Sequence, residues 1–214
     1  MKFLAIDTAN EYLSVVAYND GKIARAFLPD CSMRHSTQIM AQVENALSES
    51  GMTLPECDFF AAVVGAGSFT GIRIGVSAVK GFCLATGKPS LPVTSFEIAA
   101  YNALGQDGKT LCLVDALHDA YYVCGFDEQK KVCLQPAYLT EKEVLALSLQ
   151  GYALRAVRPT DAWSIGIAAK ADVAACDPTE GLLNAVLAKA NAGEFAPLDA
   201  LYVRKSSAEI NLGK

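Results

Sequence analysis

A strand–turn–strand pattern that occurs in both halves of the chain is the strongest constraint on its fold. The first copy runs from Phe3 to Asp20 (FLAIDTANEYLSVVAYND) and the second from Leu111 to Glu128 (LCLVDALHDAYYVCGFDE). When the two copies are aligned, Asp7 falls on Asp115, about half of the 214-residue chain further on. Two apolar runs that carry an aspartate at the same place indicate an internal duplication. The sequence therefore predicts two αβ lobes of similar build.

Each half also carries the helix patterns that a pair of αβ lobes needs. Turn signals such as Asn19-Asp20-Gly21 separate the strands, and apolar residues recur every three or four positions in the helices. The predicted strands are Lys2–Thr8, Leu13–Tyr18, Ile23–Leu28 and Phe59–Val64, and the predicted helices are Ser36–Ser50, Thr70–Ala85 and Phe96–Leu104. In the second half we predict helices at Glu141–Gln150, Ile167–Cys176 and Gly181–Ala190, and a strand at Leu198–Arg204. The predicted lobes are residues 1–106 and 107–214, and the C-terminal segment is a candidate to pack back on the first lobe.

A glycine loop joins the strand at Phe59–Val64 to the helix that follows it. Gly65, Gly67 and Gly71 fall within seven residues, and Thr70 is a candidate N-cap. Such a loop has two uses. Its free N–H groups can hold an anion, or its small residues can let another surface come close.

The helix after the loop favours the second use, in which its small residues let another surface pack closely against it. Each interior glycine costs about 1 kcal/mol relative to alanine, which close packing must recover. Small residues lie on two overlapping faces. One face holds Gly71, Gly75, Ala78, Phe82 and Ala85, and the other holds Ile74, Ala78, Gly81 and Ala85. The packing is either against the helix's own sheet or against a helix of another chain, and both interpretations stay open.

The composition is that of a mildly acidic globular protein. The net charge is −5 and 52% of the residues are apolar, which argues against a disordered chain and against unaided binding to a polyanion. Asp7 interrupts the first apolar run, so no signal peptide is predicted, and no run approaches membrane-spanning length. The seven cysteines include no C-x-x-C pair. This pattern predicts a reducing cytoplasm, without disulfides or a thiolate zinc site.

Several segments resemble the bacterial TsaB (YeaZ) family. GAGSFTGIRIG is similar to the family signature GPGSFTGLRIG, with Ala66 where the family usually has proline. The likeness continues in FLAIDTAN, RHSTQIM, DALHDAYYVCGF and LYVRK, and it covers most of the chain. The resemblance implies a duplicated α/β fold of two lobes, the actin, sugar-kinase and heat-shock-chaperone ATPase (ASKHA) fold.

Candidates for catalysis are few. Asp7 sits where ATPases of that fold place a carboxylate near metal and phosphates, but a strand-end aspartate also makes a turn hydrogen bond, and no glycine loop follows Asp115. His35 and His118 have no H-x-x-x-H spacing, unlike the histidine pair of the related TsaD family. Ser68 lies in no G-x-S-x-G elbow. Two enzyme alternatives stay open: an ATPase or phosphotransferase using Asp7 and the Gly65–Gly71 loop, and a glycoprotease-like metallopeptidase.

The resemblance instead implies a non-catalytic subunit without cofactor or metal of its own. In the family such a chain binds and stabilises the TsaD-type transferase, which places a threonylcarbamoyl group on N6 of adenosine 37 in tRNAs reading ANN codons. The resemblance also implies a TsaE-type ATPase partner, a homodimer when the chain is alone, contact with tRNA only through the complex, and no membrane. Nucleotide binding at an interface shared within the complex stays open.

The family builds its pairing surface from its first two helices, which match Ser36–Leu47 and Thr70–Ala85 here. The predicted contact residues are Ser36, Ile39, Met40, Val43, Gly71, Ile74, Gly75 and Ala78. Arg73 is then either a solvated residue or a partner for a carboxylate. Arg204 and Lys205 belong either to a solvated tail or to a contact with RNA or a partner protein.

Overall fold

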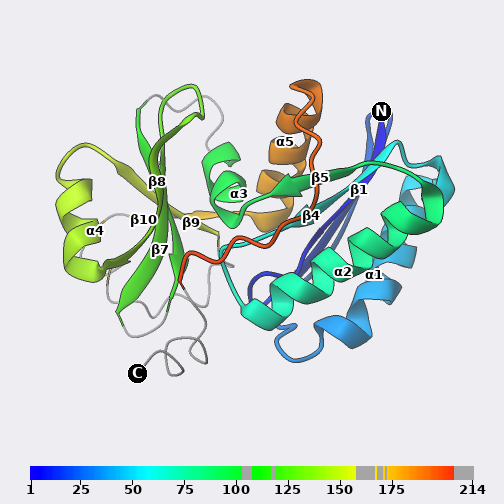
Figure 1. Cartoon of the computed structure of the whole chain (residues 1–214), viewed down its shortest axis with the longest axis horizontal. Coiled ribbons are helices and arrows are strands. Elements are labelled where there is room, and N and C mark those ends of the chain that lie inside the picture. Colours follow the sequence, from blue (N-terminus) through cyan, green and yellow to red (C-terminus); the bar gives the residue numbers. More distant parts are fainter. Residues whose placement is uncertain (103–107, 117–118, 158–166, 168–170, 172, 205–214) are drawn as a thin grey trace.

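The computed structural model describes residues 1–102, 108–116, 119–157, 167, 171 and 173–204, which form two α/β lobes (Figure 1). Each lobe is built on a five-stranded sheet, with strand order β3-β2-β1-β4-β5 in the first and β10-β9-β6-β7-β8 in the second. The first sheet consists of β1 (Lys2–Asp7), β2 (Leu13–Asn19), β3 (Lys22–Leu28), β4 (Phe59–Val63) and β5 (Ser90–Val93). The second consists of β6 (Thr110–Asp115), β7 (Ala120–Phe126), β8 (Val132–Thr140), β9 (Ala153–Val157) and β10 (Val173–Cys176).

The two sheets have the same topology, which confirms the duplicated two-lobe α/β fold predicted from the sequence. β1 pairs antiparallel with β2 and parallel with β4, and β6 pairs in the same way with β7 and β9. Asp7 and Asp115 are the last residues of β1 and β6, as the sequence alignment of the two copies predicts. Asp20 and Gly21 both have positive φ in the turn between β2 and β3, which is the backbone conformation that tight hairpin turns require.

The helices arrange the sheets in layers (Figure 1). They are α1 (His35–Ser50), α2 (Phe69–Thr86), α3 (Ser95–Tyr101), α4 (Glu141–Ser148) and α5 (Pro178–Asn191), with a short 3-10 turn at Leu54–Glu56. α1 and α2 cover the outer face of the first sheet, α4 lies on the outer side of the second, and α3 and α5 pack together between the sheets. Because helices cover both faces of β1 and β4, these central strands are almost continuously apolar and buried.

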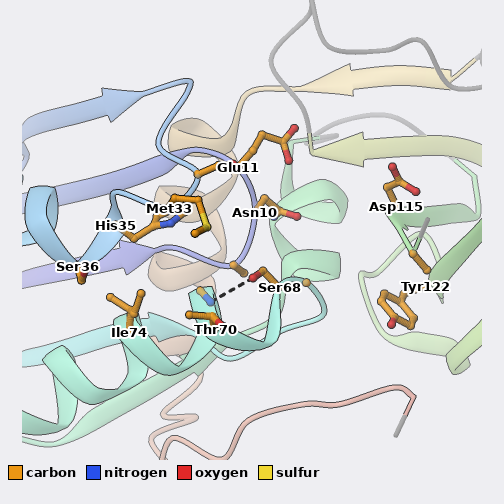
Figure 2. Close-up of a pocket in the computed structure, with 15 residues that line it drawn as sticks. Asn10, Glu11, Met33, His35, Ser36, Ser68, Thr70, Ile74, Asp115 and Tyr122 are labelled. Carbon is orange, nitrogen blue, oxygen red and sulfur yellow. Dashed lines mark hydrogen bonds between the residues drawn. The ribbon is translucent and has the colours of Figure 1, made fainter. Parts of the chain in front are cut away.

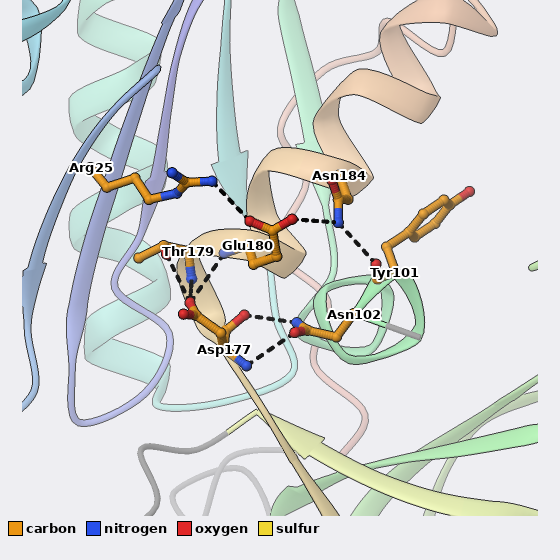
Figure 3. A network of polar contacts seen from close by, with 7 residues as sticks. All are labelled: Arg25, Tyr101, Asn102, Asp177, Thr179, Glu180 and Asn184. Carbon is orange, nitrogen blue, oxygen red and sulfur yellow. Dashed lines mark hydrogen bonds and ion pairs between the residues drawn. The ribbon is translucent and has the colours of Figure 1, made fainter. Parts of the chain in front are cut away.

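The two central helices join the lobes. α3 follows the first sheet in sequence but packs against β6 and β9, and α5 follows the second sheet but packs against β1, β2 and β5. Figure 3 shows the polar joint between them: Asn102 Nδ2 donates to the carbonyl oxygen of Asp177 at 2.7 Å, and the N–H of Asp177 donates to Asn102 Oδ1 at 3.1 Å. Glu180 pairs with Arg25 at 2.8 Å. The first turn of α5 is therefore tied both to β3 and to the end of α3.

The second half departs from the sequence prediction at Ile167–Cys176. Its last four residues form strand β10, parallel to β9, and not the end of a helix. A short alanine-rich segment has little preference of its own, so the neighbouring strand decides its conformation. Residues 168–170 and 172 of this predicted helix lie outside the described residues, as do the predicted helix end near Leu104 and the predicted lobe boundary between residues 106 and 107. Strands β5, β8 and β9 were absent from the prediction.

The C-terminal segment, residues 195–204, joins no sheet, so the strand predicted at Leu198–Arg204 is wrong. The segment runs along the first lobe, where Ala196 N–H donates to the Ser90 carbonyl oxygen at 3.1 Å and Leu201 N–H donates to that of Val64 at 2.7 Å. These isolated hydrogen bonds and the buried side chain of Leu198 hold the segment in place without a ladder.

Candidate functional site

The glycine loop is packed tightly against the turn that follows β1. Ser68 N–H donates to the Ala9 carbonyl oxygen at 2.7 Å, and Gly67 has a φ of 153° at a point where a Cβ atom would collide with that same carbonyl. Ser68, and not the predicted Thr70, is the N-cap of α2, since its Oγ accepts the N–H of Gly71 at 3.2 Å. The glycine loop therefore packs against the turn after β1 in its own lobe.

Gly71 and Gly75 face the end of β1, which corrects their predicted role as contacts for another chain. A Cβ atom at Gly71 would collide with the carbonyl oxygen of Thr8, and one at Gly75 would lie 2.5 Å from Thr8 Oγ1. Thr8 Oγ1 also donates to the Gly71 carbonyl oxygen at 2.7 Å. The absence of side chains at these glycines lets α2 approach its own sheet, so the intrachain interpretation is the right one for this face.

The predicted role of Ile39 and Val43 as contacts for another chain is also corrected, because both face their own lobe. Both are buried on the face of α1 that packs against β2 and β3. Their spacing of four residues is that of an amphipathic helix whose apolar stripe faces its own core.

The other face of the helix pair points outward. Of the eight predicted contact residues, Ser36 and Met40 are exposed, and Ile74 and Ala78 are half-buried at the edge of the core. Two further apolar side chains are exposed, Met33 just before α1 and Leu84, which is 88% exposed, near the end of α2, and neither was predicted. Helical spacing from Ile74 through Gly81 was the signal that pointed to this face. We call Met33, Ser36, Met40, Ile74, Ala78, Gly81 and Leu84 the outer helix face.

A cleft of about 610 Å³ opens between the lobes, next to the outer helix face (Figure 2). Its floor is formed by the turn after β1 and the start of α2, and its far wall by the end of β6 and by Tyr122 of β7. Glu11 reaches it from one lobe and Asp115 from the other, and no lysine or arginine is found among the described residues that line it. The lining side chains include Asn10, Glu11, Met33, His35, Ser68, Thr70, Ile74, Asp115 and Tyr122.

Asp7 does not line this cleft. Its carboxylate is fully buried, accepting the N–H of Ala9 at 2.8 Å and the hydroxyl of Tyr12 at 2.7 Å. Burial raises the pKa of Asp7 to about 6, against the lowering effect of these two hydrogen bonds and of His35. The pKa of Tyr12 is raised well above its usual value, by burial and by the Asp7 charge. Asp7 therefore makes the turn hydrogen bond that was the alternative to a metal- or phosphate-binding role.

His35 is a structural residue of the same turn. Its ring is buried, and Nε2 lies 2.9 Å from the Tyr12 carbonyl oxygen. His118 lies outside the described residues. Within the described ranges, no group of three or more His, Cys, Asp or Glu residues is placed to hold a metal ion. Those ranges also contain no helix long and apolar enough to cross a membrane.

The buried carboxyl of Asp7 predicts a pH dependence of stability. The folded protein keeps the Asp7 proton up to about pH 6, whereas the unfolded chain releases it near pH 3.8. The stability contributed by this group is therefore full below about pH 4 and is lost as the pH rises through about 6. Replacing Asp7 with asparagine should remove this loss, which is on the order of 3 kcal/mol.

Urea denaturation of the wild type and of Asp7→Asn at pH 4, 5, 6 and 7 measures the effect. Every other titratable group is common to both proteins, so the difference between their curves isolates Asp7. If the difference in free energy of unfolding between the two proteins does not change with pH, burial does not raise the pKa of Asp7.

Comparison with known proteins gives consistent matches. The family model described as "TsaD: tRNA N6-adenosine threonylcarbamoyltransferase" matches residues 27–153. The chain is 36% identical over 118 residues to the tRNA threonylcarbamoyladenosine biosynthesis protein TsaB of Escherichia coli K12, covering 54% of this chain and 51% of that protein. It is 27% identical over 146 residues to the protein of the same name from Bacillus subtilis 168, covering 68% and 63%. The chain thus spans between half and two thirds of the length of these relatives.

A solved structure shows the same fold. YeaZ from Pseudomonas aeruginosa matches with a TM-score of 0.74 at 23% identity, covering 94% of this chain and 99% of that one. Both lobes are therefore included in the likeness, which extends beyond the segments that the sequence comparisons align.

Proposed function

The chain belongs to the bacterial TsaB (YeaZ) family, and we propose that it is a non-catalytic subunit that binds and stabilises a TsaD-type transferase. The reaction served would be the threonylcarbamoylation of adenosine 37 in tRNAs reading ANN codons. The observation that carries the proposal is the outer helix face, where exposed methionine and leucine side chains lie on two adjacent helices. Exposed apolar patches of this kind mark protein–protein contacts.

The burial of Asp7 supports the non-catalytic part of the proposal. In an ATPase of this fold a carboxylate at this position would have to reach metal and phosphates in the cleft. Here both carboxylate oxygens accept hydrogen bonds inside the lobe.

Kinship between the chain and its proposed partner supports pairing through the same helices. A family model for the transferase matches more than half of this chain, so the two proteins are relatives, and a relative can present an equivalent pair of helices. Such a contact is close to self-complementary, as it is between identical subunits. The same face then serves a homodimer when the chain is alone and a heterodimer when the transferase is present. A TsaE-type ATPase would join that heterodimer, in the cytoplasm.

Co-expression with a tagged TsaD-type transferase tests the proposal. We expect this chain to co-purify in equal amounts with the transferase, and the purified pair, together with the other proteins of the pathway, to modify tRNA where the transferase alone does not. Calorimetric titration of the isolated chain with Mg-ATP should give no micromolar binding and no turnover. Failure to co-purify, or ATP turnover by the isolated chain, would contradict the proposal.

A further inference from the structure

Exposed aromatic rings and arginines alternate along the rim of the cleft. At the start of α2 the guanidinium of Arg73 lies 3.7 Å from the centre of the Phe69 ring, and Arg73 Nε donates to the Tyr202 hydroxyl at 3.1 Å. The rings of Phe69 and Tyr202 stack with their centres 4.8 Å apart. In the second lobe, the guanidinium of Arg204 lies 4.9 Å from the ring centre of Tyr138 on β8. We call Phe69, Arg73, Tyr138, Tyr202 and Arg204 the rim strip.

The C-terminal segment connects the two parts of the rim strip, because Tyr202 contacts the first lobe and Arg204 contacts the second. Its hydrogen bond from Leu201 to Val64 fixes the chain just before Tyr202, and Arg204 then reaches β8. In Figure 1 the segment passes from the first lobe to the second near the start of α2. Tyr138 in turn contacts Tyr122, which lines the cleft, with ring centres 6.0 Å apart. The strip is therefore continuous with the cleft wall and held in place before any ligand binds.

The two arginines of the strip have no carboxylate partner among the residues that the structure describes. Within the described part of the chain, neither Arg73 nor Arg204 forms a salt bridge, although the protein as a whole has a net charge of −5. Phe69 is 40% exposed, Tyr202 41% and Tyr138 37%. Two guanidinium groups that have no carboxylate partner among the described residues, beside aromatic side chains that are partly exposed, are suited to a ligand that is both anionic and flat.

We propose that the rim strip contacts unpaired nucleotides of the tRNA when this chain is part of the complex, so the inference rests on the proposed function. Unpaired bases stack on aromatic side chains and arginine planes, and guanidinium groups bind phosphates. An acidic peptide would also pair with the arginines, but it would leave the rings of Phe69, Tyr138 and Tyr202 without a matching surface. Stacking on flat rings is what distinguishes RNA here.

The test uses the complete complex with a tRNA transcript and a double variant, Arg73→Gln with Arg204→Gln. We expect tRNA affinity to fall roughly tenfold and the slope of log affinity against log salt to decrease by about 1 to 2, since each phosphate contact contributes about one unit. Phe69→Leu with Tyr138→Leu should weaken binding to a similar extent with little change in slope, because stacking is not a charge contact. Lys142→Gln, which removes an exposed cation from α4, is the matched control and should change neither quantity.

Wild-type complex provides a second measurement that does not depend on the folding of any variant. Photocrosslinking with 4-thiouridine-labelled tRNA, followed by mass spectrometry, should place crosslinks on peptides that contain Phe69, Tyr138 or Tyr202. An intact complex whose double arginine variant binds tRNA with unchanged affinity and slope would refute the rim strip alone. Loss of transferase binding by that variant would make the strip a protein contact and also refute it. Absence of a complex with the wild-type chain would instead refute the proposed function.

Discussion

Replacing Gly71 with alanine is expected to lower the free energy of unfolding by roughly 3–4 kcal/mol, close to the upper end of the range for single substitutions. The new methyl group would meet the carbonyl oxygen of Thr8, which is main chain and cannot rotate away as a side chain would. β1 ends immediately before Thr8, and its pairing with β2 and β4 leaves it no room to shift. Urea denaturation followed by circular dichroism measures the loss.

Gly81 provides the matched control on the same helix. A Cβ atom there meets nothing within 4 Å, and the residue is exposed. Gly81→Ala should therefore be neutral or should stabilise the protein by up to about 1 kcal/mol, through helix propensity alone. Equal effects at Gly71 and Gly81 would mean that propensity, and not the approach of α2 to β1, governs both positions.

These two glycines show what the sequence could not predict, namely which surface each small-residue face of α2 packs against. The periodicity of α2 predicts two small-residue faces, but a glycine is required equally for contact with a sheet and for contact with another helix. Only the position of Thr8 decides that Gly71 and Gly75 face inward. Ile74, Ala78 and Gly81 are then left on the outer side, next to Leu84, whose exposure no pattern in the sequence indicated.

The fold was predictable where local signals repeat. The aspartate shared by the two strand–turn–strand copies gave the duplication, and the Asn19-Asp20-Gly21 turn gave the first hairpin. Both signals are local, so the duplication and the hairpin can be predicted without knowing any tertiary contact. Strand β10 and the C-terminal segment lack such signals, because short alanine-rich or mixed sequences take the conformation that their neighbours impose. Asp7 was ambiguous for another reason: only the structure places the Tyr12 hydroxyl 2.7 Å from its carboxylate.

Placing a carboxylate on the outer helix face should weaken transferase binding by roughly 100-fold, which corresponds to the loss of a binding hot spot. The variant is Met40→Glu on α1 combined with Leu84→Glu on α2. Met40 is 47% exposed and Leu84 88% in the isolated chain, so the monomer loses little packing. In the complex, each new carboxylate would be buried without a cation, and that desolvation opposes association. Calorimetric titration with the TsaD-type partner measures the change, and sedimentation of the isolated variant should show loss of the homodimer.

Leu149→Glu is the control that makes this result specific. Leu149 is 91% exposed at the end of α4, in the other lobe, so the substitution also replaces an exposed apolar side chain with a carboxylate. It should leave partner affinity within about twofold, because substitutions outside an interface core carry little binding energy. If Leu149→Glu weakens binding as strongly as the double variant, or if the double variant binds like wild type, the partner does not use the outer helix face. The transferase would then have to contact another part of the chain, such as α4 or the edge strand β8 of the second lobe.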